Sequence, residues 1–193
     1  ARRRGDPSKF DPGKIPKVVD GDGDTPGPNH REDIGRPWVS AQLSGGVAPV
    51  FIDIRPSREV AGGALPGAIL LPGSLCLERT ELLPADKGIR LTIYDQTGEL
   101  GSAEVAAQLR DAGWPLARRL RGGYAEWIEH DESVTVPAAA DGGRLRPGDP
   151  ARVADGREGH IMRSWAREGT TWVEVSFEDG SSSGEIDENI LLS

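Results

Sequence analysis

The sequence is poor in the side chains that build disulfides and metal sites. Cys76 is the only cysteine among 193 residues, which excludes an internal disulfide and a thiolate metal cluster. The histidines His30, His130 and His160 lie far apart along the chain, with none of the short spacings typical of metal ligands. We therefore expect no metal ion and no cofactor, and the cysteine content fits a reducing, cytoplasmic compartment.

Long apolar runs are also missing. No run approaches the roughly 20 residues that a membrane-spanning helix needs, and no signal-like stretch follows the basic start Ala1–Arg4. The net charge is −8, whereas a general nucleic-acid or anionic-membrane binder needs clustered Lys and Arg. We expect no membrane span and no nucleic-acid partner, which leaves proteins as the expected partners.

Residues 1–35 are rich in Pro, Gly and Asp and have few apolar side chains to bury. Such a stretch does not fold by itself, so we expect an extended arm that a partner holds in place. The expected anchors are Phe10, Ile15, Val18 and Val19. Asp20–Asp24 resembles the start of a calcium loop, but Thr25 and Arg31 stand where Gly and Glu are needed, so a solvated turn is favoured.

Residues 36–136 alternate strand and helix signals, which predicts a parallel sheet with helices on its faces. Strands are expected at Pro49–Ile54, Gly67–Pro72, Ile89–Asp95 and Arg118–Leu120. Ser102 is a good N-cap for a helix that Gly113 ends, and a second helix carries Trp127. The charge pair Asp53/Arg55 is expected to tie down the loop after the first strand.

Three motifs follow one another in this segment: DIRPSREVAGGALPGAILLP, LTIYD and AAQLRDAGWPLARRLRGGYAEW. Together they resemble the rhodanese-like (single-domain sulfurtransferase) family. The first is similar to its Asp-x-Arg … Glu … Gly-His-x-Pro-Gly-Ala pattern, with Ala64 in place of the His. The matched positions are Asp53, Arg55, Glu59, Gly63, Pro66, Gly67, Ala68, Gly122, Gly123 and Trp127. The resemblance implies a rhodanese-like α/β fold over residues 36–136.

The resemblance also implies where the chemistry would lie. A rhodanese uses a thiolate at the first position of the loop after the LTIYD-type strand, and backbone N–H groups converge on the persulfide that forms there. Here Asp95 has that position, Glu99 adds a negative charge and Leu100 stands where an Arg is expected. A carboxylate cannot form a persulfide, so a degenerate loop and a pseudo-enzyme without catalytic residues are predicted. The loop comprises Asp95, Gln96, Thr97, Gly98, Glu99, Leu100, Gly101 and Ser102.

Short β runs follow a linker at residues 137–147. Asp-Gly pairs at 155–156 and 179–180 are hairpin signals, and Thr171–Phe177 alternates apolar residues with residues such as Glu174. We expect a small all-β unit over residues 148–193 that resembles SH3-like barrels of the KOW or Tudor type. Its acidic balance disfavours RNA binding. The candidate partner-binding aromatics of this unit are Trp165 and Trp172.

The leading hypothesis is a catalytically inactive rhodanese-like subunit that acts as a protein-interaction and structural module in a larger assembly. A sheet-end loop can be repurposed to receive a peptide, and Asp95 with Glu99 favours a basic one. Two alternatives stay open. One is a sulfurtransferase that uses the non-standard Cys76, which lies in an apolar helical segment. The other is a regulatory sensor that binds a small ligand at the acidic loop.

Overall fold

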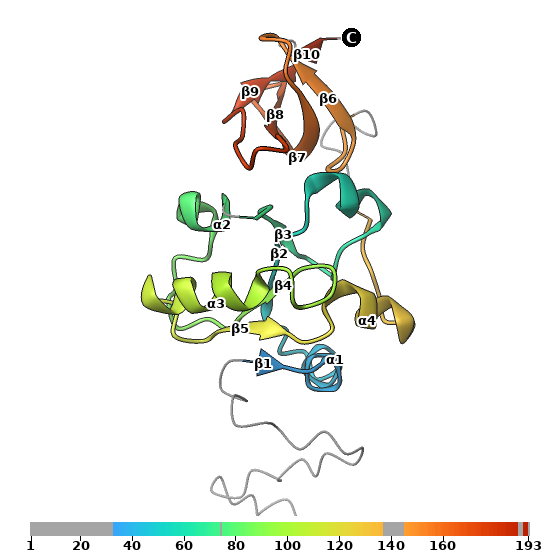
Figure 1. Cartoon of the computed structure of the whole chain (residues 1–193), viewed down its shortest axis with the longest axis vertical. Helices are drawn as coiled ribbons and strands as arrows, with labels where there is room; N and C mark the ends of the chain where they lie inside the picture. Colours follow the sequence, from blue (N-terminus) through green and yellow to red (C-terminus); the bar gives the residue numbers. More distant parts are fainter. Residues whose placement is uncertain (1–32, 74, 137–144, 189–190, 193) are drawn as a thin grey trace, which may run out of the picture.

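The computed structural model describes residues 33–73, 75–136, 145–188 and 191–192. These residues form an α/β unit and a smaller all-β unit, which together confirm the predicted fold class (Figure 1). Residues 1–32 of the predicted arm, with Phe10, Ile15, Val18 and Val19, and most of the predicted linker lie outside the described residues. The end of the predicted arm, Asp33–Ile34, is instead a strand of the sheet described next.

A five-stranded parallel sheet forms the centre of the α/β unit, in the spatial order β1-β5-β4-β2-β3. Its strands are β1 (Asp33–Ile34), β2 (Val50–Asp53), β3 (Ile69–Leu70), β4 (Leu91–Tyr94) and β5 (Ala117–Leu120). All of β4 is buried, as expected for a central strand that is covered on both faces. The predicted strands are present, and β1 adds an edge strand that the sequence pattern did not indicate.

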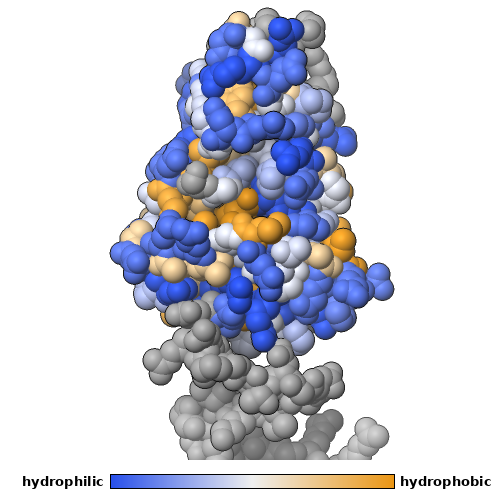
Figure 2. Space-filling model, in the orientation of Figure 1, coloured by the Kyte–Doolittle hydropathy of each residue, from blue (hydrophilic) through white to orange (hydrophobic). Residues whose placement is uncertain are grey.

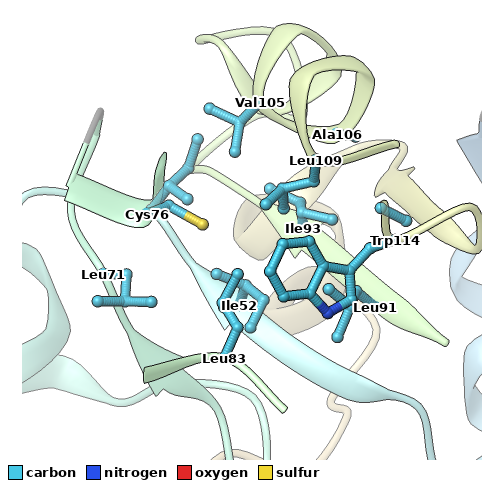
Figure 3. Packing of buried hydrophobic residues seen from close by; sticks show 12 residues of the cluster. Ile52, Leu71, Cys76, Leu83, Leu91, Ile93, Val105, Ala106, Leu109 and Trp114 are labelled. Carbon is cyan, nitrogen blue, oxygen red and sulfur yellow. The ribbon is translucent and has the colours of Figure 1, made fainter. Parts of the chain in front are cut away.

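Helices cover both faces of this sheet. On one face, α1 (Arg36–Ser44) and α4 (Gly123–Glu129) pack Val39 and Trp127 against Phe51. On the other face, α2 (Leu75–Glu78) and α3 (Ser102–Asp111) enclose a second apolar cluster, in which Trp114 lies beside the sheet (Figure 3). The 3-10 segments η1 (Ser57–Gly62) and η2 (Thr80–Leu82) follow β2 and α2.

The start of α3 differs by one residue from the prediction. Ser102 is the first helical residue, and Gly101 has the N-cap position with a left-handed φ of 109° and no side-chain capping bond. The N–H group of Ser102 instead donates to the carboxylate of Asp95, at 3.0 Å. The cap of α3 is therefore supplied from the end of β4, which local sequence does not reveal.

The all-β unit is a curled antiparallel sheet with the spatial order β10-β6-β7-β8-β9. Its strands are β6 (Pro150–Val153), β7 (Glu158–Arg167), β8 (Thr170–Ser176), β9 (Ile186–Asp187) and β10 (Leu191–Leu192). Buried Val153, Ile161, Met162, Val173 and Val175 form its core. The Asp-Gly turns are present, with left-handed φ values of 87° at Gly156 and 83° at Gly180.

The two units are in direct contact. Ser176 of β8 donates a hydrogen bond to Ser57 of η1 at 2.7 Å, and Arg79, which follows α2, binds the carboxylate of Glu174. Glu174 is 0% exposed although it alternates with the core residues of β8, because the second side of that strand faces the α/β unit. The all-β unit thus stands over the carboxyl ends of β2 and β4 (Figure 1).

Candidate functional site

Asp95 begins the loop between β4 and α3, and its side chain is held from several directions. The residue is 3% exposed. Its carboxylate accepts hydrogen bonds of 2.5 to 3.0 Å from the backbone N–H groups of Thr97, Gly98, Leu100 and Ser102. Backbone donors ahead of a helix are favourable partners for a negative charge. Asp95 is therefore the organising acceptor of the loop.

This geometry decides what the loop presents to its surroundings. The N–H groups that converge at its centre already have an acceptor, which is a carboxylate of the same chain. Glu99 and Leu100 point outward instead, and Leu100 is 69% exposed. The surface of the loop is thus made by side chains rather than by free backbone donors.

The Gly-Gly pair at the start of α4 allows the helix to approach the loop. A Cβ on Gly123 would lie 2.4 Å from the carbonyl oxygen of Asp95, and the residue has a φ of +55°. The N–H group of Tyr124 donates to the same carbonyl at 2.9 Å. Only glycine satisfies both this contact distance and this backbone conformation without strain.

The Asp53/Arg55 pair lies beside Tyr94 at the end of β4 and is buried. Arg55 donates to the carboxylate of Asp53, at 2.7 Å for the closest contact, and to the carbonyl of Gly63 at 2.7 Å. Tyr94 donates to Asp53 at 2.7 Å, and the guanidinium stacks 3.7 Å from the ring centre of Tyr124. Burial acts to lower the pKa of Arg55, but the hydrogen bond and charge of Asp53 outweigh it and raise that pKa. The pair ties down the segment after β2.

A cleft of about 460 Å³ lies above the loop, between the two units. It is at the carboxyl ends of β2 and β4, from which the chain leads to β3 on one side and to β5 on the other. Such a switch point is where open α/β sheets bind ligands. The lining residues used below are Arg58, Glu59, Gln96 and Leu100 from the α/β unit, and His160, Phe177 and Glu178 from the all-β unit.

The contribution of the all-β unit to this cleft is what the sequence interpretation missed. His160 lies in β7, whereas Phe177 and Glu178 follow β8, and no local motif connects these residues with the loop at Asp95. On the viewed face, apolar surface is exposed at the level where the two units meet (Figure 2). The cleft residues of the all-β unit and those of the α/β unit come together only because the two units dock, and this docking is a property of the folded chain.

The candidate residues Trp165 and Trp172 lie together on the all-β unit, away from the cleft. They are cross-strand neighbours on β7 and β8, and both are half-buried. The guanidinium of Arg163 lies 4.2 Å from the ring centre of Trp165, and that of Arg167 lies 4.3 Å from Trp172. Trp165 is roughly 17 Å along β7 from cleft-lining His160, at about 3.4 Å per residue. The candidate residues Asp95 and Trp172 are therefore not brought into one site.

Cys76 is 0% exposed and packs on α2 among Ile52, Leu71 and Ile93 (Figure 3). Burial raises the pKa of its thiol to about 12. The thiol is therefore neutral near pH 7, whereas the thiolate is the nucleophilic form.

Two further findings concern the part of the chain that the structure describes. No group of three or more His, Cys, Asp or Glu side chains there is arranged to hold a metal ion. None of the helices in that part has the length and apolar character to cross a membrane.

The comparisons with known proteins agree with this architecture. Residues 36–130 match the family model of the rhodanese-like domain. A sulfurtransferase of Allochromatium vinosum is 30% identical over 99 residues, which are 51% of this chain and 90% of that protein. A thiosulfate:glutathione sulfurtransferase of Homo sapiens is 31% identical over 108 residues, 49% of this chain and 91% of that protein. A Bacillus halodurans structure shares the fold at 19% identity and a TM-score of 0.50, covering 63% of this chain and 83% of that chain.

These relatives contradict the prediction that the chain is a pseudo-enzyme and not an enzyme. Both curated relatives are named for sulfurtransferase activity, and the match spans about nine tenths of each. The prediction rests on the loop positions Asp95, Glu99 and Leu100, and the naming of the relatives overturns it at the level of the family. The activity in each of these names is the activity of the named protein.

Proposed function

The chain belongs to the rhodanese-like family, and from this premise we propose that it acts as a protein-binding subunit of a larger assembly. In this proposal the cleft between the α/β unit and the all-β unit receives a segment of a partner protein. The proposal concerns binding at the cleft, and a binding role is compatible with the chemistry for which the relatives are named.

One observation carries the proposal: the carboxylate of Asp95 takes up the backbone N–H groups at the centre of the loop. A small anion therefore finds no free cluster of backbone donors there. The cleft instead offers side chains, with Leu100 largely exposed on one side and Phe177 half-buried on the other. Apolar anchors with a few polar groups around them are typical of peptide-binding sites.

The cleft also has walls that are fixed relative to each other. Ser57 and Ser176 are hydrogen-bonded at one place between the units, and Arg79 and Glu174 form an ion pair at another. A site held open by such contacts loses less conformational entropy on binding than a flexible one does. This pre-organisation supports recognition of an extended segment.

Several further features belong to the proposal. Protein partners are favoured over nucleic acid by the net charge of −8, and we place the chain in the cytoplasm. The all-β unit would be an SH3-like barrel, with Trp165 and Trp172 as its own contact residues. The arm that precedes β1 would be a second contact with the same assembly.

Photo-crosslinking in the native cells tests the binding role of the cleft. The amino acid benzoylphenylalanine is placed at Leu100, and in a control variant at Val47, which is 60% exposed and precedes β2 at the opposite edge of the sheet. We expect a discrete crosslinked product from Leu100 and none of that mass from Val47. Absence of a product at Leu100, or the same products from both positions, contradicts the proposal.

A second candidate function is sulfur transfer, which is favoured by the two curated relatives. In this chain it would use Cys76, because the sequence has no other thiol. The thiol is buried, so access would require α2 to move. The test is the intact mass after exposure to thiosulfate. A gain of one sulfur atom that is lost in Cys76→Ala supports this function, and an unchanged mass counts against it.

A further inference from the structure

The positive and negative side chains around the cleft do not balance, and this imbalance bears on what the cleft binds. The cations that line it are Arg55 and Arg58. Arg55 is buried and bound to Asp53, so its charge is compensated within the fold. Arg58 is the one lining cation left near the surface in the described structure, and its side chain is 49% exposed.

Two exposed carboxylates line the same cleft. Glu178 approaches Arg58 only to 3.9 Å and its side chain is 85% exposed, so this ion pair is weak and screened by salt. The side chain of Glu59, which is exposed, has no hydrogen bond or ion pair with another described residue. Glu99 adds a further exposed carboxylate beside Leu100. The accessible charge at the cleft is therefore negative, like that of the whole chain.

The apolar part of the cleft lies between these charges. Leu100 comes from the loop after β4, and Phe177 follows β8. Gln96 and His160 also line the cleft, and neither side chain is hydrogen-bonded to another described residue. An apolar side chain seated against Leu100 and Phe177 would thus bring its neighbours next to Glu59 and Glu178.

Resting on the proposed function, we propose that the cleft recognises an extended peptide segment in which an apolar residue is flanked by Lys or Arg. The apolar residue supplies buried contact area, and the flanking cations are attracted by the two glutamates. Electrostatic complementarity of this kind mainly selects the partner and speeds its association. An acidic segment would be repelled by these exposed carboxylates and would be rejected.

Selection from a random peptide library on the immobilised full chain tests this specificity. We expect the enriched peptides to share an apolar residue next to Lys or Arg. The affinity of the best enriched peptide is then measured for the wild type, for Glu178→Lys and for the control Glu129→Lys, an exposed glutamate at the end of α4. We expect about a tenfold loss for Glu178→Lys, equivalent to about 1.4 kcal/mol, and little change for Glu129→Lys. Raising the salt concentration should reduce the difference between the two variants.

The outcomes separate this inference from the proposed function. Enriched peptides without basic residues, no enrichment, or equal losses in both variants overturn the basic specificity. If Leu100 still crosslinks to a discrete partner in cells, the cleft binds a segment of other chemistry and the proposed function stands. If Leu100 gives no crosslink either, both proposals fail.

Discussion

At the scale of single residues, Asp95 is a structural acceptor as well as a member of the cleft. Its carboxylate accepts hydrogen bonds from four backbone N–H groups of the loop that follows it. We expect Asp95→Asn to lower the free energy of unfolding by about 2–4 kcal/mol, because the amide sets a donor against backbone donors and removes the charge. Urea denaturation measures this loss of stability.

The control is Asp86→Asn. Asp86 is exposed and its side chain accepts one hydrogen bond, from the N–H group of Gly88, so we expect a loss of less than about 1 kcal/mol. Equal losses in the two variants would show that the loop does not depend on the carboxylate.

The burial of the Cys76 thiol predicts how the free energy of unfolding changes at alkaline pH. Its thiol has a pKa of about 12 in the folded chain against an ordinary value of 9.0. The folded state therefore keeps its proton where the unfolded state loses it, so the stability that the neutral thiol contributes is full below pH 9 and declines between about pH 9 and pH 12. We expect the unfolding free energy of the wild type to fall more steeply across this window than that of Cys76→Ala, by up to about 1.4 kcal/mol per pH unit. Parallel pH profiles of the two proteins would refute the burial of the thiol.

At the scale of elements, the approach of α4 to the loop depends on Gly123. A Cβ there would lie 2.4 Å from the carbonyl oxygen of Asp95, and the φ of +55° is unfavourable for any other residue. We expect Gly123→Ala to cost about 3 kcal/mol or more in chemical denaturation, the sum of backbone strain and displacement of the loop. Gly46→Ala is the matched control, since its φ is +74° and a Cβ there has nothing within 4 Å. It should show the strain alone, about 1–2 kcal/mol. A control that is as costly as Gly123→Ala would rule out the close contact.

The elements also mark how far the sequence predicts the structure. The strands around Phe51 and Ile93 and the helix that carries Trp127 are predictable, because burial on both faces of a parallel sheet leaves a continuous apolar run. The cap of α3 is not predictable, since its acceptor Asp95 lies seven positions before Ser102 and belongs to another element. β1, with two residues, is too short to give a pattern.

At the scale of the whole molecule, the docking of the two units lies beyond the sequence pattern. Alternation along β8 indicates a two-sided strand, but it does not say that the side with Glu174 faces Arg79 of the α/β unit instead of water. The wall of the cleft that the all-β unit supplies therefore could not be predicted, because His160, Phe177 and Glu178 line the cleft only when the units come together. The position of the Asp95 loop, by contrast, could be predicted from the sequence, because the strand before it is recognisable.

The contact between the units gives the last prediction. Glu174 is fully buried and accepts bonds from Arg79 of the α/β unit and from Arg163 and Ser182 of its own unit. Glu174→Ala leaves the Arg79 and Arg163 guanidiniums without their shared carboxylate, so we expect a loss of about 3 kcal/mol, toward the lower end for broken buried pairs because both arginines are partly exposed.

The decisive readout is cooperativity rather than total stability. A chain whose units stabilise each other unfolds in one transition, whereas weakened docking lets the two units unfold separately. We expect one calorimetric transition for the wild type and two for Glu174→Ala. Glu185→Ala is the control, because this exposed glutamate pairs with Arg163 and Arg167 within the all-β unit and has no ion pair with a described residue of the α/β unit. It should keep the single transition. If Glu174→Ala also unfolds in one transition, the remaining contacts between the units, among them the Ser57–Ser176 hydrogen bond, are enough to couple them, and the walls of the cleft do not depend on the buried carboxylate.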